Sequence, residues 1–401
     1  MRLSDYQVLQ RGPGDIARVT LDSGETVELP VGGPYEVGGA KNVLVGDLWI
    51  LAGQSNMEGS ADLVDVETPH PRVHSFQSRE EWAPAEEPLH WLGESPREVH
   101  HSIWGLLMPR SIPPRDPNRT KGAGLALTFA KHLVEATGVP IGLIPAAHGG
   151  TSMQQWSPAL RDRGGKSLYG ATYKRFQEVG GKVAGILWYQ GESDANPSEA
   201  PPYEERMIAL INAFRSDFSQ PDLPFYYVQI GGWVNDPTPG IVNGWNHVRE
   251  VQRRLPDRLP NIEMVSAIDL GLDDGIHIDT AGLKILGKRL AAVTLGHKAP
   301  ALKSVAYEMN FGMLRVSFDN INGALQAAGR PTGFSLRDAR GVELPIIYKV
   351  TLEGTNALLQ LTDPERMLGA RLWYGYGLAP YVNLTDSSGA AIPAFGPILI
   401  S

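Results

Sequence analysis

Five short runs of mainly apolar residues recur between residues 43 and 268, and each is followed by a turn or a polar cluster. A strand that is apolar on both faces leaves no side for water, so such runs are typical of a parallel sheet with helices packed on both sides. The runs occupy residues 43–52, 140–146, 183–189, 224–230 and 263–268. They predict the strands of one parallel sheet.

Helical patterns lie between these runs. Residues 124–137 end before Gly138 and residues 281–295 end before Gly296, and glycine commonly follows the last turn of a helix. Asp279 or Thr280 can cap the second helix, whose apolar face is formed by Leu283, Leu286, Leu290 and Val293. Strands alternating with helices predict a doubly wound α/β domain over residues 43–300.

Both ends of the chain have the pattern of β-structure. Residues 16–29 alternate apolar and polar around Asp22-Ser23-Gly24, as a hairpin does. A lone hairpin is marginally stable, so we expect residues 1–42 to pack on the α/β domain or on the C-terminal part. Short runs at 314–318, 358–361 and 370–377, with Gly- and Pro-rich breaks between them, predict a β-sandwich-like domain over residues 301–401.

Composition excludes several classes of function. The 401 residues include no Cys, which excludes disulfides, thiolate metal ligands and a cysteine nucleophile. With 36 basic and 44 acidic residues and a formal charge of −8, we expect no nucleic-acid or membrane partner. The chain has no signal-peptide pattern and no apolar run approaching the roughly 18 residues of a membrane span. We expect a soluble protein, cytoplasmic or, if a signal has been removed, secreted or periplasmic.

Polar clusters follow four of the apolar runs. They are Gly53-Gln54-Ser55-Asn56, His148-Gly149-Gly150-Thr151, Gln190-Gly191-Glu192-Ser193-Asp194 and Asp274-Gly275-Ile276-His277. In an open parallel sheet, ligands bind at the carboxyl ends of the strands, so these clusters predict one site. Residues 60–121 contain several Pro with scattered His and Trp, and we expect a long irregular insertion there of the kind that often carries function.

The clusters contain the residue types that acyl transfer needs. Ser55 follows a strand at a turn eased by Gly53, where a nucleophile is presented in α/β enzymes, although a serine there can also be a plain helix cap. Asp274 can orient His277 at Nδ1 and leave Nε2 facing Ser55. Alternatively, Asp274 and His277 only cap the helix that begins near residue 281.

Donors for an oxyanion are also present. The backbone N–H of Ser55, an N–H from Gly149 or Gly150, and the amide of Gln190 can form a three-donor hole, although the glycine pair alone is equally typical of a turn. A metal-bound water is the weaker alternative, since His90, His100 and His101 have no ligand spacing of the usual kind and no carboxylate-rich set beside them. We expect no metal.

The combination of motifs resembles the sialate O-acetylesterase (SASA) family of the SGNH hydrolase superfamily. The resemblance rests on Gly-Gln-Ser-Asn-Met at 53–57, Gly-Gly-Thr at 149–151, Trp-Tyr-Gln-Gly-Glu-Ser-Asp at 188–194 and Asp-Gly-Ile-His at 274–277. The ending at 373–398 also looks like that family's terminal segment. Compared with the wider superfamily, Gln54 stands where an aspartate is usual, and the third block lacks the usual asparagine.

The resemblance implies a flavodoxin-like three-layer α/β/α core, removal of O-acetyl groups from sugars, and no cofactor. It makes Ser55 the nucleophile, His277 the base and Asp274 its orienting carboxylate. Ser55, Gly149 or Gly150, and Gln190 would supply the oxyanion donors, and the supporting residues would be Gln54, Asn56 and Glu192.

We therefore predict a serine esterase that acts on acetylated carbohydrate by an acyl-enzyme mechanism. An acetylesterase for xylan or other hemicellulose or pectin fragments is an alternative specificity, and a carbohydrate-binding protein with an idle site is an alternative class. The sequence leaves open the sugar, the acetylated hydroxyl, the oligomeric state and whether the C-terminal domain binds glycan.

Overall fold

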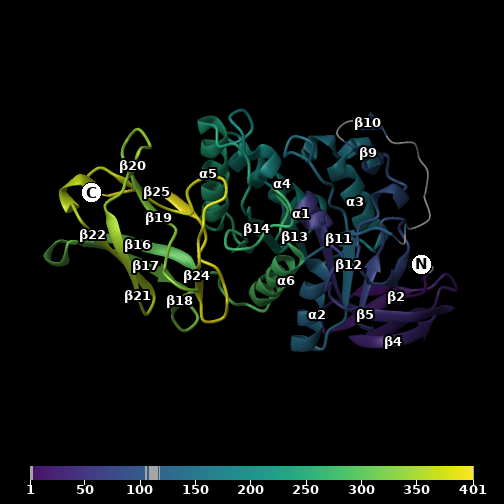
Figure 1. The fold of residues 1–401 in the computed structure, drawn as a ribbon. Coiled ribbons are helices and arrows are strands. Elements are labelled where there is room, and N and C mark those ends of the chain that lie inside the picture. Colours follow the sequence, from purple (N-terminus) through teal and green to yellow (C-terminus); the bar gives the residue numbers. More distant parts are fainter. Residues whose placement is uncertain (1–2, 104–105, 108–115, 117, 401) are drawn as a thin grey trace.

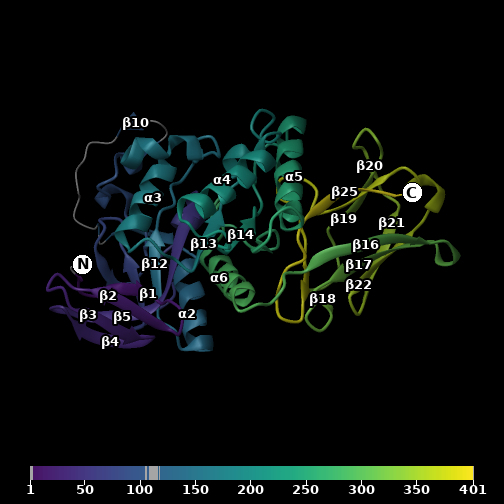
Figure 2. The ribbon, with the colours of Figure 1, turned by 180° about the vertical axis from the view of Figure 1, so that it is seen from behind.

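A computed structural model describes residues 3–103, 106–107, 116 and 118–400. The chain is laid out along one axis, with the N-terminal strands at one end, a central α/β region, and the C-terminal strands at the other end (Figure 1). The view from behind shows the same order (Figure 2). No helix in the described part of the chain is long and apolar enough to cross a membrane.

The central sheet has the strand order β15-β14-β13-β5-β12-β7-β8, and all neighbours are parallel except β7 and β8. From the central strand β5, the chain adds strands outward in both directions, so β5 ends at the switch point where ligands bind in such sheets. The bounds are β5 (Ala40–Gly53), β7 (Val73–Phe76), β8 (Trp82–Pro84), β12 (Ile141–Pro145), β13 (Gly185–Tyr189), β14 (Phe225–Gln229) and β15 (Ile262–Ser266). All five predicted strands are present.

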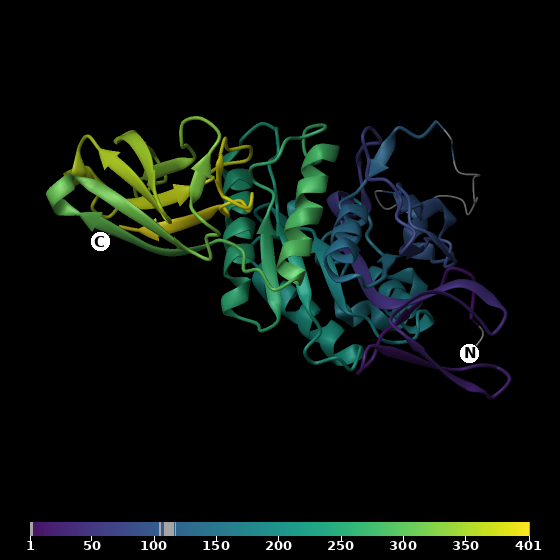
Figure 3. The same cartoon turned by 90° about the horizontal axis from the view of Figure 1, so that it is seen from below.

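Helices cover both faces of this sheet, which confirms the predicted three-layer α/β/α fold (Figure 3). On one face, α2 (Ala126–Thr137) packs against α6 (Thr280–Thr294), and both ends agree closely with the prediction. The other face carries α3 (Leu168–Glu178), α4 (Tyr203–Asp217) and α5 (Pro239–Arg254). Asp279 caps α6 by accepting a hydrogen bond from the Gly282 N–H at 2.6 Å.

Residues 60–121 differ from the irregular insertion that we expected. They supply β7 and the antiparallel edge strand β8 to the central sheet. Short elements complete this part: β6 (Ala61–Asp62), β9 (Ser102–Ile103), β10 (Leu106–Leu107) and β11 (Lys121–Ala123). The apolar pattern of β7 is too short to stand out without its neighbours, because it is only VHSF in sequence.

Two of the N-terminal strands, β1 and β4, extend the central sheet, and the other two form a separate two-stranded sheet. The predicted hairpin is present as β2 (Ile16–Thr20) and β3 (Thr26–Pro30). The N-terminal half of β5 pairs with β1 (Val8–Gln10) and with β4 (Gly32–Val37). Because β5 runs through residues 42 and 43, where we divided the chain, no break separates the N-terminal strands from the α/β region.

The C-terminal β region, residues 301–400, has an apolar core between two four-stranded antiparallel sheets. Their orders are β16-β17-β22-β21 and β20-β19-β23-β25, and β18 pairs with β24. The bounds are β16 (Ala301–Glu308), β17 (Met313–Asp319), β18 (Leu325–Ala327), β19 (Phe334–Arg337), β20 (Glu343–Leu344), β21 (Ile347–Glu353), β22 (Asn356–Leu361), β23 (Arg371–Tyr374), β24 (Leu384–Asp386) and β25 (Phe395–Leu399).

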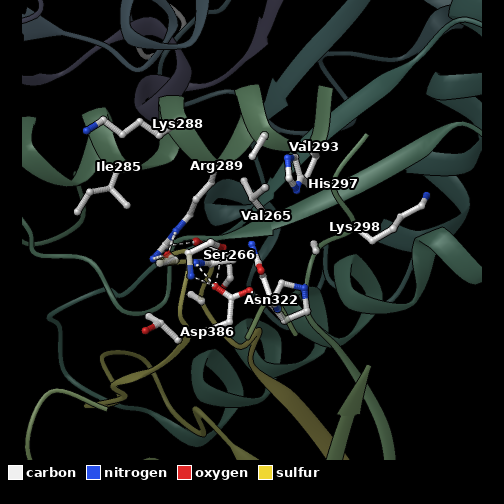
Figure 4. A pocket seen from close by; sticks show the side chains of 18 of the residues that line it. Val265, Ser266, Ile285, Lys288, Arg289, Val293, His297, Lys298, Asn322 and Asp386 are labelled. Atoms are coloured by element: carbon white, nitrogen blue, oxygen red, sulfur yellow. Dashed lines mark hydrogen bonds between the residues drawn. The ribbon is translucent and has the colours of Figure 1, made fainter. Parts of the chain in front are cut away.

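A cavity of about 510 Å³ lies between α6 and the C-terminal β region (Figure 4). Arg289 of α6 borders it, pairs with Asp269 at 2.7 Å and donates to the carbonyl oxygen of Gly389 at 2.8 Å. The α6 residues that line the cavity begin at Ile285, so it lies beyond the start of this helix, on the side away from His277.

Candidate active site

Ser55 is the second residue after the end of β5 at Gly53, and it begins the short helix α1 (Ser55–Glu58). The turn requires Gly53, whose φ is +131° and whose position would put a β-carbon 2.2 Å from the carbonyl oxygen of Tyr189. The Gln54 N–H then donates to that same oxygen at 2.8 Å. This close approach of β5 to β13 holds Ser55 at the carboxyl edge of the sheet.

The structure brings Ser55, His277 and Asp274 into one chain of hydrogen bonds. Ser55 Oγ lies 2.9 Å from His277 Nε2, and His277 Nδ1 lies 2.7 Å from Asp274 Oδ2. A carboxylate only accepts, so Nδ1 carries the proton and Nε2 is free to accept from the serine hydroxyl. This is the arrangement that activates a serine.

Asp274 is held ionised by its own turn. Partial burial pushes the pKa of Asp274 upward, but the His277 side chain and the N–H groups of Ile276 and His277 hydrogen bond to the carboxylate and lower this pKa to about 2. Helix α6 is capped by Asp279 instead. Asp274 and His277 are therefore not used as caps for that helix.

Asn56 links the serine helix to the histidine turn. Its Oδ1 accepts from the Ile278 N–H at 3.0 Å, and its Nδ2 donates to Glu192 Oε1 at 2.8 Å. Burial raises the pKa of Glu192 despite the hydrogen bond from Asn56. These contacts place Asn56 and Glu192 beside the serine helix and the histidine turn, and their supporting role stays a prediction.

Gln54 joins the serine turn to the segment after β13. Its Oε1 accepts from the N–H groups of Ser193 and Gly191 at 3.3 and 3.5 Å. Since the oxygen is held on that side, the Nε2 of the amide points the other way. Sequence reasoning had no physical role for this side chain.

The predicted oxyanion donors differ in availability. The Gln190 amide is fully buried and donates to Asp194 Oδ2 at 2.5 Å and to the Thr151 carbonyl at 3.1 Å. Both amide hydrogens are thus engaged away from Ser55, unlike the role that we expected for Gln190. The Gly149 N–H donates to Glu58 Oε2 at 2.7 Å, and Gly150 adopts a positive φ of +69° at the cavity wall.

Glu58 is a site residue that sequence reasoning missed. Protein encloses its carboxyl except where it borders the cavity, and this burial raises the pKa of Glu58 to about 7, against the lowering effects of the Gly149 N–H, Arg119 and His277. Residues three apart share a helix face. Glu58 at the third position after Ser55 could therefore have been singled out in the sequence.

Three buried histidines lie next to the loop that contains Gly149 and Gly150. The rings of His100 and His148 stack at 5.4 Å with their Nδ1 atoms 3.1 Å apart, and His90 Nε2 accepts from the Ala147 N–H at 3.3 Å. Burial lowers the pKa of His90 to about 3 and that of His100 well below its usual value, so both are neutral. Within the described residues, no three His, Asp or Glu side chains are grouped so as to hold a metal ion.

The serine opens into a cavity of about 440 Å³. Its wall combines apolar side chains with the polar groups described above. The lining residues are Gln54, Ser55, Glu58, Ser60, Leu92, His148, Gly149, Gly150, Glu192, Ser193, Trp233, Ile276 and His277.

Serine ester hydrolases use a serine, a histidine and an aspartate that are joined in this way, and they present the serine at the carboxyl edge of a doubly wound sheet. Residues 45–296 match the family described as "Carbohydrate esterase, sialic acid-specific acetylesterase" (SASA). The chain belongs to this family, and is a carbohydrate acetylesterase by membership.

Relatives agree with this assignment. A probable carbohydrate esterase from Arabidopsis thaliana is 31% identical over 261 residues, which are 62% of this chain and 90% of that protein. The human sialate O-acetylesterase is 24% identical over 294 residues, which are 60% of this chain but only 53% of that enzyme.

One solved structure shares the whole architecture. A carbohydrate acetylesterase from Xanthomonas citri covers 98% of this chain, and 98% of that chain is covered, with a TM-score of 0.72 and 24% identity. At this level of identity the likeness supports the fold, including the C-terminal strands.

Proposed function

We propose that the protein removes O-acetyl groups from a sugar of the sialic acid type, through an acyl-enzyme formed on Ser55. The observation that carries this proposal is the contact of 2.9 Å between Ser55 Oγ and His277 Nε2, on a histidine held by Asp274. The family description and the names of the relatives point to the sialate substrate.

In the first step, Ser55 Oγ attacks the acetyl carbonyl carbon while its proton passes to His277 Nε2. The tetrahedral intermediate collapses, the bond from the acetyl carbon to the sugar oxygen breaks, and His277 returns the proton to that oxygen. Water then attacks the acetyl-serine with His277 as base, and acetate leaves as the proton returns to Oγ. Asp274 keeps the imidazole in the required tautomer and stabilises its positive form.

The developing oxyanion needs donors beside Ser55. We propose the backbone N–H groups of Ser55 and Gly150, and the N–H of Gly149 once the Glu58 carboxyl yields to the substrate. The side-chain amide that we propose as a further donor is Gln54 rather than Gln190. Gln54 lines the cavity, and no hydrogen bond among the described residues uses its Nε2.

The cavity suits a small acyl group beside a polar leaving group. Leu92, Trp233 and Ile276 give it apolar surface, while Ser193, Ser60 and Glu192 offer polar contacts. An acetyl methyl group fits the first set, and sugar hydroxyls fit the second.

The test is acetate release from O-acetylated sialic acid and from acetylated xylan, by the wild type and by Ser55→Ala. We expect release from the sialate by the wild type and none by the variant. Faster release from xylan would overturn the sialate specificity, and turnover by Ser55→Ala would overturn the nucleophile. Sugar binding by a wild type that releases no acetate from either substrate would favour a binding protein.

A further inference from the structure

Residues 375–379, which follow β23, bring the C-terminal β region to the wall of the active-site cavity. Within this segment the Leu378 carbonyl accepts from the Trp233 N–H at 3.0 Å. Trp233 belongs to the loop after β14 and lines the cavity at Ser55. A cavity wall of the α/β region is thus bonded to a loop of the other region.

Arg249 of α5 joins the same two loops. Its guanidinium is buried and donates to five backbone carbonyls. Two acceptors, Ile230 and Gly231, precede Trp233 in the chain, and three, Gly375, Gly377 and Leu378, belong to the C-terminal segment. The five N–H groups of the guanidinium match these five carbonyls in number, so the charge is satisfied only when both loops are in place.

Two neighbours on α5 complete the junction. Asn246 Oδ1 accepts from the Gly377 N–H at 2.9 Å, and the Trp245 ring stacks on Trp233 at 5.6 Å with an interplanar angle of 25°. The Trp233 side chain is therefore packed against the Trp245 ring, and the Trp233 backbone is hydrogen bonded to the carbonyl of Leu378.

The loop that carries Trp233 is also hydrogen bonded to the turn that holds Asp274 and His277. The Val234 N–H donates to the Gly275 carbonyl at 2.7 Å, and Gly275 follows Asp274. Movement of the 231–234 loop would thus displace Trp233 in the cavity wall, and through the Val234 hydrogen bond it would also shift the turn that holds His277.

We infer that the C-terminal β region is a positioning element of the active site, which fixes Trp233 against the substrate through Arg249, Asn246 and Leu378. The inference rests on the proposed function for its kinetic readout. Since Trp233 lines the cavity and takes no part in the proton transfers, its displacement weakens substrate binding more than it slows the chemistry.

The experiment uses Asn246→Ala, which removes one contact of the junction and leaves Arg249 in place. Asn383→Ala is the matched control, because Asn383 also bonds backbone groups of the C-terminal β region, at Ala328, Arg330 and Thr332. The full-length variants are assayed on O-acetylated sialic acid. We expect a KM raised about three- to tenfold for Asn246→Ala, with kcat within about twofold, and no such rise for the control.

A double-mutant cycle shows whether the effect passes through Trp233. Trp233→Ala should raise the KM by itself, and adding Asn246→Ala should then raise it little further. Fully additive changes, or equal KM changes in Asn246→Ala and Asn383→Ala, would overturn the inference.

Hydrogen exchange of the 231–234 amides gives a readout that needs no activity. We expect faster exchange at Trp233 and Val234 in Asn246→Ala than in the wild type or in Asn383→Ala. Unchanged exchange would overturn the inference even if the esterase is active. Faster exchange in a protein without esterase activity would instead overturn the proposed function and leave the junction standing.

Discussion

Two groups of residues around Ser55 differ in how far their contacts are already formed: the histidine side, with His277 and Asp274, and the oxyanion side, with Gly149 and Gln190. On the histidine side, the contacts from Ser55 to His277 and Asp274 are already within hydrogen-bond distance. On the opposite side, the Gly149 N–H is engaged by Glu58 and the Gln190 amide by Asp194. The contacts of the proposed proton transfer are therefore formed in advance, whereas one of the proposed oxyanion donors, the Gly149 N–H, must first be released by Glu58.

The difference has an electrostatic reason. A negative oxyanion and an ionised Glu58 carboxylate compete for the same N–H donor and repel each other. The raised pKa of Glu58, about 7, means that this carboxyl gives up its charge far more easily than an ordinary glutamate. As a neutral acid, Glu58 would not repel an oxyanion at the proposed donors.

The largest loss of activity is expected on removing the Ser55 hydroxyl, which lies between the histidine side and the oxyanion side. Ser55→Ala should lower kcat for p-nitrophenyl acetate by at least about 10⁴-fold, because in the described part of the chain only the Ser55 hydroxyl hydrogen bonds to His277 Nε2. Circular dichroism should match the wild type. Substantial turnover in this variant would remove the basis for comparing the two sides at all.

The histidine side can be divided further. His277→Ala should lower kcat by about 10⁴-fold, while Asp274→Asn should cost much less, about 10²-fold. Asp274 is partly exposed, with 44% of its side chain accessible, so water can take over part of its orienting role. Steady-state kinetics check both values, and an equal loss in the two variants would contradict this division of roles.

The oxyanion side is tested by exchanging amides. Gln54→Glu keeps an acceptor for the Gly191 and Ser193 N–H groups but puts an anion where the donor was. It should lower kcat about 10²-fold with a smaller change in KM.

Gln190→Met is the counterpart for the amide that is engaged elsewhere. It removes both buried hydrogen bonds, so it should cost about 1–3 kcal/mol in free energy of unfolding while kcat of the folded enzyme changes little. If Gln190→Met lowers kcat and Gln54→Glu does not, the donor is Gln190, as the resemblance implied.

The smallest effect concerns Glu58 and pH. In an unfolded chain a glutamate loses its proton near its ordinary pKa of 4.5, whereas in the fold burial lets Glu58 keep its proton up to about pH 7. Wild-type stability contributed by this group is therefore complete below about pH 4.5 and is lost as the pH rises to about 7. Glu58→Gln is neutral throughout.

The stability of Glu58→Gln relative to the wild type should thus increase from pH 4.5 to pH 7 and then stay level. Thermal unfolding at several pH values measures this difference. A constant difference across this range would show that Glu58 is not a shifted carboxyl, and the contrast between the two sides would lose its electrostatic explanation.

Sequence patterns located the strand ends well, and with them most of the site. Ser55 and His277 each follow a strand or a turn at the same sheet edge, and edge position is a local property of the sequence. Gln190 was harder, because an amide two residues from Glu192 can face either side of the loop. Only the position of Asp194 and of the Thr151 carbonyl decides which side it faces.

Long-range contacts were beyond reach of the patterns. The five acceptors of Arg249 come from segments more than 120 residues apart, so no local spacing could reveal them. Strands β7 and β8 were missed for a related reason. They are short, and they are strands only because β12 offers an edge for β7 to pair with.

The length of β5 leaves part of this strand dependent on the N-terminal strands for its cover. Its 14 residues serve two neighbourhoods, and the lower part around Val43, Leu44 and Val45 is covered by β1 and β4. A chain shortened to begin at residue 43 would expose that part as an unpaired, apolar edge, the kind of template on which further chains add as strands. Strands β1 and β4 thus cover the N-terminal part of the strand that leads to Ser55, and this cover prevents other chains from pairing with its apolar edge.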